Sequence, residues 1–230
     1  MPEAAVERTP GRGRFISFEG GEGSGKSTQI KTLAERLAAA KLRTIVTREP
    51  GGSPGAEIIR YLVLSGMGKL LGPEAETLLF AAARDDHVRT VIEPALKQGI
   101  WVLSDRFSDS TRVYQGSVGQ VAPAIVSAMQ RVTIGDLKPD LTVILDVPVE
   151  VGMRRAAARR GTGAADRFEA EDIRFHQQLR DAYRQIAVDE PQRCVLIDAT
   201  AEPGIVAANI WSALRKRLFA TGAGNLASSA

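Results

Sequence analysis

The segment GGEGSGKS at residues 20–27 constrains the fold of this chain more than any other part of the sequence. It fits the pattern G-x-x-x-x-G-K-[ST], which needs a strand before it and a helix after it. Both are predicted here, because FISFE at 15–19 is a short apolar run and residues 26–40 have helical spacing. A flexible glycine loop with a helix cap would explain the glycines, but it would not require Lys26 and Ser27 at this spacing. The segment therefore indicates a site for the phosphates of a nucleoside triphosphate.

The chemistry of this loop depends on its backbone and on two side chains. Glycines allow several backbone N–H groups to point at one anion, and the start of the helix adds positive potential. Lys26 would reach the β- and γ-phosphates, and the Ser27 hydroxyl would ligate Mg²⁺. The residues that we predict to bind the nucleotide are Gly20, Gly21, Glu22, Gly23, Ser24, Gly25, Lys26, Ser27 and Thr28.

The rest of the chain alternates between short β-branched runs and longer helical stretches. Further strands are predicted at 43–47, 100–104, 141–147 and 194–198, and further helices at 54–65, 73–98, 121–134, 149–160, 167–188 and 203–219. This order implies βαβ units, so we predict an α/β protein with the P-loop NTPase fold, in which helices flank a five-stranded parallel sheet. We expect one domain over 14–219, with a disordered extension over 1–13 and a disordered tail over 220–230.

Composition argues against several other classes of protein. A chain of 230 residues with one cysteine and two histidines has no disulfide framework and no zinc site built from several cysteines. It has no run of about 18 apolar residues that could span a membrane, and its N-terminus does not resemble a secretory signal. The net charge of +3 is too small to argue for a nucleic-acid partner. We therefore expect a cytoplasmic protein with small-molecule substrates and no membrane or nucleic-acid partner.

A phosphate loop alone leaves a kinase, a GTPase and a motor ATPase open. The guanine-reading motif N-K-x-D does not occur, and little length remains for the extra domains of motor ATPases. Polar residues follow two strands at the edge where parallel sheets bind ligands, with REPGG at 48–52 and DRF at 105–107. A surface ion pair between Arg48 and Glu49 is the better interpretation of the first segment taken alone. Because the second segment leaves a buried strand straight into the cleft, the two together favour a small-molecule kinase.

A set of segments in fixed order carries a resemblance to a known family: FEGGEGSGKST, TREPGG, FAAAR, DRF, ST-x-x-YQG and DRFE. The set is similar to bacterial thymidylate kinases, which are phosphate-loop nucleoside monophosphate kinases, from about Phe15 to Trp211. The REPGG and ST-x-x-YQG segments discriminate this family from other phosphate-loop kinases. The resemblance implies transfer of the γ-phosphoryl group of ATP to dTMP, giving ADP and dTDP for dTTP synthesis. It also implies Mg²⁺ as cofactor and a homodimer.

The resemblance also assigns the acceptor site. Phe80 would stack on thymine and Arg84 would bond a carbonyl group of the base, and their i,i+4 spacing places both on one helix face. A core phenylalanine beside a surface arginine is the alternative interpretation of this pair. Thr111 would contact the thymine edge, and Tyr114 would pack on the sugar and disfavour a 2′-hydroxyl. The remaining acceptor-site residues that the resemblance implies are Ser110 and Gln115.

Charged residues of the site have implied roles as well. Arg48 and Arg106 resemble the clamps on the acceptor phosphate, and the fork geometry of arginine suits that role. Asp105 resembles the carboxylate that holds Mg²⁺ or the surroundings of the acceptor phosphate, and Glu22 resembles the loop carboxylate near the deoxyribose. The implied catalytic set is Lys26, Arg106, Asp105, Arg160, Arg159 and Glu22, with Ser27 and Asp105 as metal ligands.

An arginine-rich segment at about 154–167 is predicted to form a lid. It contains Arg154, Arg155, Arg159 and Arg160, followed by Gly161, Thr162 and Gly163. A solvated basic helix end is one interpretation, because a helix C-terminus suits cations. Four like charges repel one another, however, which makes an anion that gathers them plausible, and phosphoryl transfer needs positive charge around the transferred group. The resemblance implies that the lid supplies this charge, with Arg160 as the best match and Arg167 of the DRFE segment as a second marker.

The sequence departs from the family pattern in two places. Phe107 stands where relatives usually carry Tyr or His, and the run Ser117-Val118-Gly119-Gln120 replaces a run through glycines to an arginine. Two alternatives stay open: another nucleoside monophosphate kinase with a retuned base pocket, and a non-catalytic nucleotide-binding regulator. The intact Lys26 and Asp105 count against the regulator. Cys194 is predicted to be a small buried hydrophobe rather than a reactive group.

Overall fold

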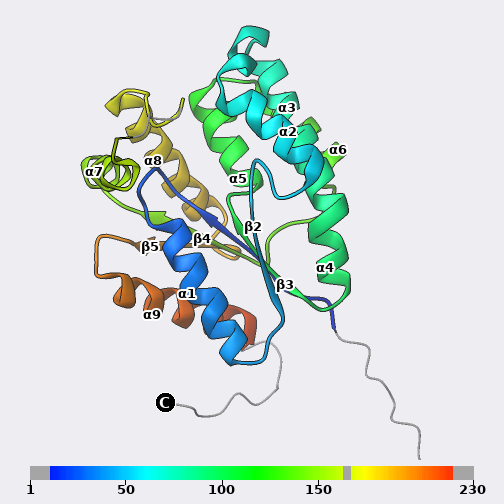
Figure 1. Cartoon of the computed structure of the whole chain (residues 1–230), viewed down its shortest axis with the longest axis vertical. Coiled ribbons are helices and arrows are strands. Elements are labelled where there is room, and N and C mark those ends of the chain that lie inside the picture. Colours follow the sequence, from blue (N-terminus) through cyan, green and yellow to red (C-terminus); the bar gives the residue numbers. More distant parts are fainter. Residues whose placement is uncertain (1–10, 163–166, 220–230) are drawn as a thin grey trace, which may run out of the picture.

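A parallel sheet lies at the centre of the chain (Figure 1). The computed structural model describes residues 11–162 and 167–219. Five strands follow in the spatial order β2-β3-β1-β4-β5, and every neighbouring pair is parallel. Their bounds are β1 Phe15–Glu19, β2 Thr44–Arg48, β3 Trp101–Asp105, β4 Leu141–Asp146 and β5 Cys194–Asp198. The predicted α/β architecture is confirmed.

Burial of the strands follows their position in the sheet. Every residue of β1 is buried, and so are all residues of β4 except the last, Asp146, because helices cover both faces of these central strands. The edge strands β2 and β5 are partly exposed. The register pairs Arg48 with Asp105 and Phe18 with Asp105, so the ends of β1, β2 and β3 meet at one edge of the sheet.

Helices fill the connections between strands. The α-helices are α1 Lys26–Ala39, α2 Pro54–Leu64, α3 Pro73–His87, α4 Glu93–Lys97, α5 Ser108–Thr111, α6 Pro123–Thr133, α7 Val149–Arg160, α8 Ile173–Asp189 and α9 Pro203–Leu214. Shorter helical turns lie at η1 Met67–Leu71, η2 Val88–Ile92, η3 Arg112–Val118 and η4 Arg215–Phe219.

The observed helices differ from the predicted ones at particular residues. The helix predicted over 73–98 is interrupted by η2, because Pro94 lacks the N–H group that would continue the hydrogen-bond ladder. Helix α8 begins at Ile173 rather than at residue 167, because the Asp172 side chain accepts a hydrogen bond from Phe175 N and caps it. The helical turns α5 and η3 were not predicted, since their short, largely polar sequence lacks a clear apolar period.

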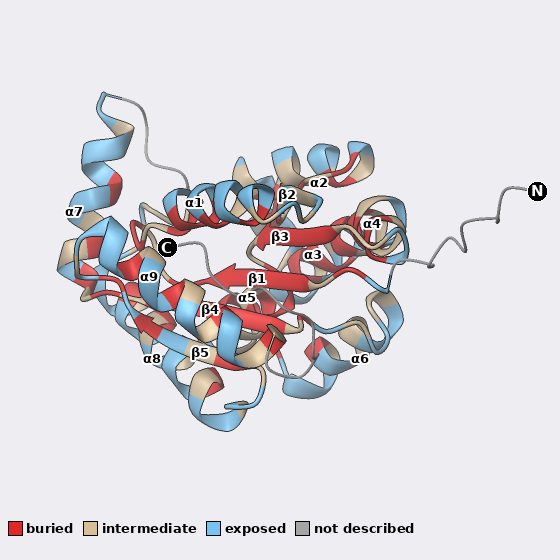
Figure 2. Cartoon of the chain, turned by 90° about the horizontal axis from the view of Figure 1, so that it is seen from below, coloured by how far each residue is buried: buried red, intermediate tan, exposed pale blue. Residues whose placement is uncertain are grey.

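Apolar side chains alternate between the two faces of the sheet. Ile16 and Phe18 of β1 pack with α1 and α9 on one face, whereas Phe15 packs with η2 and α4 on the other. On this second face, Ile144 of β4 packs with η3 and α8. Figure 2 shows the buried strands between helices whose outer sides are exposed. The core therefore consists of two apolar layers with the sheet between them.

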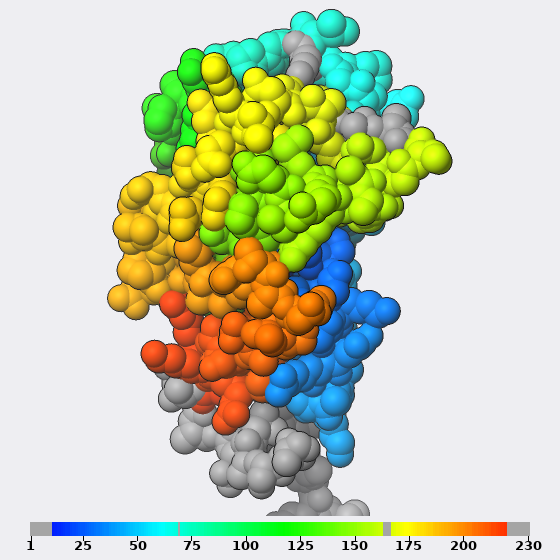
Figure 3. Space-filling model, turned by 90° about the vertical axis from the view of Figure 1, so that its left-hand side faces the viewer, coloured from blue at the N-terminus to red at the C-terminus, as the bar shows by residue number. Residues whose placement is uncertain are grey.

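Both ends of the described chain pack on the domain. Gly13 N donates to Leu96 O at 2.8 Å and Arg12 pairs with Asp140 at 2.9 Å, so these two residues contact the domain that follows them. Residues 1–10 and 220–230, the rest of the expected extension and tail, lie outside the described residues. Figure 3 shows α9 lying beside α1. Within the part of the chain that the structure describes, every helix is too short or too polar to cross a membrane.

Candidate active site

A cavity of about 320 Å³ opens beside the phosphate loop and the carboxyl ends of β2 and β3. It brings together predicted residues from distant parts of the sequence. Those that line it are Glu22, Gly23, Ser24, Gly25, Lys26, Ser27, Thr28, Arg48, Phe80, Arg84, Asp105, Arg106, Ser110, Thr111, Tyr114, Gln115 and Arg159. Gly20 and Gly21 line a smaller cavity behind the loop instead.

The phosphate loop turns sharply between β1 and α1. Gly23 and Gly25 have positive φ angles of 64° and 92°, a region that favours glycine. Lys26 Nζ donates to the carbonyl oxygens of Gly20 and Gly21, at 3.0 Å each. Burial lowers the pKa of the Lys26 ammonium group. The loop therefore holds a desolvated cation against its own backbone.

Ser27 and Asp105 meet beside the loop. Ser27 lies in the first turn of α1, Asp105 ends β3, and both line the cavity. Ser27 Oγ donates to Asp105 Oδ2 at 3.1 Å. A hydroxyl and a carboxylate are oxygen ligands of the kind that Mg²⁺ prefers. The two predicted metal ligands are therefore adjacent and of the right chemistry.

Arg106 projects from a turn with a backbone φ of 70°, which is unusual for a residue other than glycine. Its Nη2 donates to Glu22 Oε1 at 2.7 Å and its Nη1 to Gly20 O at 3.2 Å. Its guanidinium carbon lies 5.0 Å from the centre of the Tyr114 ring. Burial opposes ionisation of Glu22, but the charges of Arg106 and Lys26 outweigh it and lower the pKa of Glu22. The predicted phosphate clamp is thus a largely buried cation paired with the loop carboxylate.

The surface ion pair considered for Arg48 and Glu49 is not formed. Arg48 pairs instead with Glu57 of α2 at 2.9 Å. Glu49 is buried, where it accepts a hydrogen bond from Arg84 Nε at 2.7 Å and lies 3.1 Å from His87 Nδ1. Arg84 is only 4% exposed, so the alternative interpretation of a surface arginine is wrong as well.

His87 was not among the predicted site residues. It is fully buried, and its Nε2 lies 2.6 Å from Thr47 Oγ1. Because the Glu49 carboxylate can only accept, Nδ1 of His87 carries the proton between them. Phe80, Arg84 and His87 are spaced i, i+4 and i+7 along α3, and this spacing is the sequence signal that places His87 on their face.

Aromatic and polar residues of α5 and η3 line another side of the cavity. The Tyr114 ring packs edge-on against Phe168 at 5.1 Å, and its hydroxyl lies 3.5 Å from Glu22 Oε1. Thr111 and Gln115 are also buried and line the cavity. Phe168 lines it too, although the DRFE segment gave no prediction for that residue. The cavity therefore has one end lined by the glycine-rich loop and another end with aromatic walls.

The chain matches the family model of thymidylate kinase over residues 18–210. It is 75% identical over 221 residues to the thymidylate kinase of Bradyrhizobium diazoefficiens, which covers 96% of this chain and 97% of that protein. It is 73% identical over 230 residues to the thymidylate kinase of Nitrobacter winogradskyi, which covers 100% of both chains. This chain belongs to the thymidylate kinase family. A crystal structure of thymidylate kinase from Ehrlichia chaffeensis is similar with a TM-score of 0.72 and 32% identity, covering 89% of this chain and 100% of that one.

In this member of the thymidylate kinase family, the arginines of the predicted lid do not gather at one place. Arg159 and Arg160 both pair with Glu169, at 2.8 Å each, but only Arg159 of the two lines the cavity. Arg155 donates to the carbonyl oxygen of Ala199 at 2.8 Å, beyond the end of β5. The expectation that four arginines share one anion is therefore corrected. Gly163 and Asp166 lie outside the described residues.

Arg167 connects the segment after the lid with the acceptor side of the cavity. Its guanidinium pairs with Glu76 of α3, with Nη2 2.9 Å from Oε1, and Nη1 donates to Val63 O of α2 at 3.3 Å. The same guanidinium lies 4.6 Å from the centre of the Phe168 ring. The predicted lid marker thus holds Phe168 beside α2 and α3.

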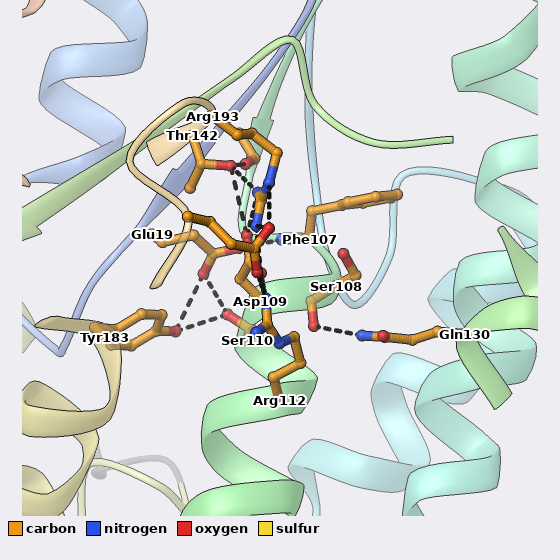
Figure 4. A network of polar contacts seen from close by, with 12 residues as sticks. Glu19, Phe107, Ser108, Asp109, Ser110, Arg112, Gln130, Thr142, Tyr183 and Arg193 are labelled. Carbon is orange, nitrogen blue, oxygen red and sulfur yellow. Dashed lines mark hydrogen bonds and ion pairs between the residues drawn. The ribbon is translucent and has the colours of Figure 1, made fainter. Parts of the chain in front are cut away.

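Figure 4 shows a network of polar contacts that includes Ser110, a residue of the cavity lining. Glu19, at the end of β1, contacts Ser110 and Tyr183, while Asp109 pairs with Arg193 at 2.6 Å. Of these residues only Ser110 was predicted to belong to the site. The sequence signal for Glu19 is a charged residue that ends a largely apolar strand directly before the glycine loop.

Proposed function

We propose that this chain transfers the γ-phosphoryl group of ATP to dTMP, giving ADP and dTDP. The observation that carries the proposal is the single cavity that joins the phosphate loop to the Phe80–Arg84 face of α3. One end suits the phosphates of a nucleotide, and the other offers an aromatic ring and a guanidinium to a flat base. Membership of the thymidylate kinase family identifies the two substrates.

Catalysis by this site rests on positioning and charge. The acceptor is a phosphate with a second pKa of about 6, so it is largely ionised at neutral pH and needs no base to attack. Lys26 and Arg159 neutralise charge that develops on the transferred group, and Arg106 holds the acceptor phosphate. Arg48 also holds that phosphate, once its exposed pairing with Glu57 is exchanged for the substrate. Arg160 supports the lid beside Arg159.

Recognition of the base rests on which nitrogens of Arg84 are already occupied. Nε donates to Glu49 and Nη2 donates to Phe107 O at 3.2 Å. Among the described residues Nη1 has no hydrogen-bond partner, and Arg84 lines the cavity. A guanidinium only donates, so it suits the carbonyl of thymine and opposes the amino group of cytosine. Phe80 supplies the stacking surface, Thr111 and Gln115 contact the base edge, and Tyr114 packs on the sugar.

Mg²⁺ belongs to this proposal as the partner of the ATP phosphates. Ser27 and Asp105 would hold it, because their oxygen atoms are adjacent and both face the cavity. Within the described residues no group of three or more His, Cys, Asp and Glu side chains could bind a metal. Mg²⁺ commonly combines one or two protein ligands with substrate phosphates and water, which fits this pair. The ion would supply charge neutralisation at the phosphates.

The enzyme works as a homodimer in the cytoplasm. The family resemblance implies the dimer, and large apolar side chains on α2 and α3 support it: Ile58 is 69% exposed, Tyr61 70% and Leu78 55%. These two helices pack against each other, so the side chains belong to one region of the surface. The lone cysteine, Cys194, is free and buried, in keeping with a reducing compartment.

An acceptor panel tests the proposed function. The purified chain is given ATP and Mg²⁺ with dTMP, dUMP, dCMP, dGMP or UMP, and ADP and the diphosphate product are measured. We expect dTMP to have the highest kcat/KM. A higher value for dCMP, dGMP or UMP would assign a different monophosphate kinase activity. Nucleotide binding without product from any acceptor would leave only a regulator.

A further inference from the structure

Glu19 is a buried carboxylate whose task the proposed mechanism does not explain. It is 0% exposed at the end of β1. Phe107 N donates to its Oε1 at 2.8 Å, and Ser110 Oγ and Tyr183 OH donate to its Oε2 at 2.7 and 3.1 Å. Figure 4 shows the three donors around this side chain. Because burying a charge is costly without such partners, these three donors stabilise the ionised form of Glu19.

The same two hydroxyl groups also face Arg106. Arg106 Nη1 lies 3.3 Å from Ser110 Oγ and 3.1 Å from Tyr183 OH, and it donates to both. A guanidinium has only donors, so each hydroxyl must accept from Arg106 with a lone pair. Its single proton must then be donated to another acceptor. The two hydroxyls also lie 2.9 Å from each other, but both donate to Glu19 Oε2, because an ionised carboxylate oxygen is a stronger acceptor than a hydroxyl. The hydroxyls therefore form two short bridges between a buried anion and the cation that lines the cavity.

The backbone of Arg106 is fixed by the same carboxylate. Its φ of 70° is unusual for a residue with a side chain. Arg106 N donates to Phe18 O at 2.9 Å, and Ser104 Oγ donates to Arg106 O at 2.7 Å. The next N–H group, that of Phe107, is the one bound by Glu19. Glu19 thus contacts both the turn that carries Arg106 and the hydroxyls that hold its side chain.

We propose that Glu19 is a positioning residue for phosphoryl transfer, which orients the Ser110 and Tyr183 hydroxyls so that they hold Arg106 toward the acceptor phosphate. The inference rests on the proposed role of Arg106 as the clamp on that phosphate. Protonation of Glu19 replaces an acceptor with a donor. One hydroxyl proton then loses its carboxylate acceptor, and the bridge to Arg106 is broken.

The charge state of Glu19 is set by its surroundings. Burial and, after it, the charge of Asp109 raise the pKa of Glu19, whereas the bond from Ser110, the charge of Arg106 and the bond from Phe107 oppose the rise, and the resulting pKa is about 7. The titratable and charged groups that face it from the surrounding elements are Lys26 of α1, Arg106 of the β3–α5 turn, Asp109 of α5, Tyr114 of η3 and Tyr183 of α8. Asp109 stays paired with Arg193 and Arg112, so its charge is held nearby. We therefore expect activity to fall as the pH decreases through about 7.

The test is the pH profile of kcat/KM for dTMP in the wild-type chain, Glu19→Gln and Tyr183→Phe. As the pH decreases, kcat/KM of the wild type should fall in two steps, the acid limbs of the profile. One limb comes from the dTMP phosphate near pH ~6, and the other comes from Glu19 near pH 7. Glu19→Gln should keep only the substrate limb and lose roughly 10- to 100-fold in kcat/KM at pH 8, the loss expected for a charged hydrogen bond. Tyr183→Phe removes a donor to the Glu19 carboxylate, so the limb that comes from Glu19 should move to higher pH. The kcat/KM for dTMP should fall by roughly 3- to 10-fold.

A matched control and a second readout keep the outcomes separate. Glu35→Gln removes an exposed carboxylate from α1 and should leave the profile unchanged. Infrared difference spectra without substrate should show a carboxyl group that titrates near 7 in the wild type and is absent in Glu19→Gln. If Glu19→Gln does not fold, the direction of the Tyr183→Phe shift decides.

A wild type with only the substrate limb, or a Glu19→Gln profile that matches the wild type, would overturn the inference. A wild type that does not phosphorylate dTMP at pH 8 would instead overturn the proposed function. In that case the infrared titration still tests whether Glu19 is ionised at neutral pH.

Discussion

Substitution of Gly152 by alanine should disturb the phosphate loop from outside the cavity. Gly152 lies in α7, and a Cβ atom added there would stand 2.5 Å from the carbonyl oxygen of Glu22. That is about 0.9 Å closer than the start of ordinary van der Waals contact at 3.4 Å. The approach is mutual, because a Cβ added at Gly23 would lie 1.9 Å from the Gly152 carbonyl oxygen. The loop and α7 therefore touch through two glycines.

Two effects of opposite sign decide the stability of Gly152→Ala. In a helix interior, alanine is more favourable than glycine by about 1 kcal/mol. Overpacking of a tight contact costs about 1–3 kcal/mol. The atom in the way is a backbone carbonyl oxygen, which cannot rotate aside as a side chain can, so we expect the overpacking to dominate. The free energy of unfolding should fall by about 1 kcal/mol.

The same displacement should weaken ATP binding. Gly23 and Glu22 belong to the loop that lines the phosphate end of the cavity. Misplacement of binding groups by about 1 Å can cost on the order of 100-fold in rate, so we expect kcat/KM for ATP to fall by at least roughly 10-fold. The KM for dTMP should change much less, because Phe80 and Arg84 lie on α3.

Gly204→Ala is the matched control for this prediction. Gly204 lies in α9, and nothing stands within 4 Å of a Cβ added there. That variant should be as stable as the wild type or more so, with unchanged kinetics. Urea unfolding and initial rates at varied ATP give both quantities. If Gly152→Ala is stabilised like Gly204→Ala and keeps the wild-type kcat/KM for ATP, the reasoning from the glycine contact is refuted.

Three further predictions concern the lid, the sugar site and the fold. The double variant Arg159→Ala, Arg160→Ala should lose at least ~100-fold in kcat with a smaller change in the KM for dTMP. If initial rates give the wild-type kcat for this variant, both arginines only belong to a solvated basic helix end. The wild type should prefer dTMP over its ribonucleotide analogue by roughly 10- to 100-fold in kcat/KM, and Tyr114→Ala should narrow that ratio; an unchanged ratio would limit Tyr114 to packing. Burial opposes ionisation of Asp140, but the bond from Phe15 N and two arginines outweigh it and lower its pKa. Its stabilising effect is present above the unfolded pKa of about 3.9 and is lost as the pH falls below that value. Urea unfolding should therefore show a cost of Asp140→Asn that shrinks on acidification, and a cost independent of pH would contradict this.

The sheet and the phosphate loop could be predicted because their signals are local. Apolar runs such as 141–147 identify a strand covered on both faces, and the G-x-x-x-x-G-K-[ST] spacing fixes the turn that follows β1. The order of the strands in the sheet has no such signal in the sequence. It depends on which helix covers which face, and on the packing of α1 with α9.

The partners of buried charges could not be predicted, because they join residues far apart in the chain. Glu49 follows Arg48 directly, yet it pairs with Arg84, 35 positions away. Glu19 meets Tyr183 across 164 positions. Motif spacing reports which residue types are present, but the direction of each side chain is decided by the burial around it. The lid shows the same limit, since Arg155 lies near Arg159 in sequence and is bound to a carbonyl oxygen beyond β5.

One cavity is proposed to hold ATP and dTMP for direct phosphoryl transfer, with Lys26 at the phosphates. Phosphorus NMR of a reaction with ATP, Mg²⁺ and dTMP tests this most directly, because it resolves ADP, dTDP and free phosphate. We expect equal amounts of ADP and dTDP from the wild type, and a folded Lys26→Ala variant that is at least ~100-fold slower. ADP with free phosphate and no dTDP, or a Lys26→Ala variant as fast as the wild type, would contradict it.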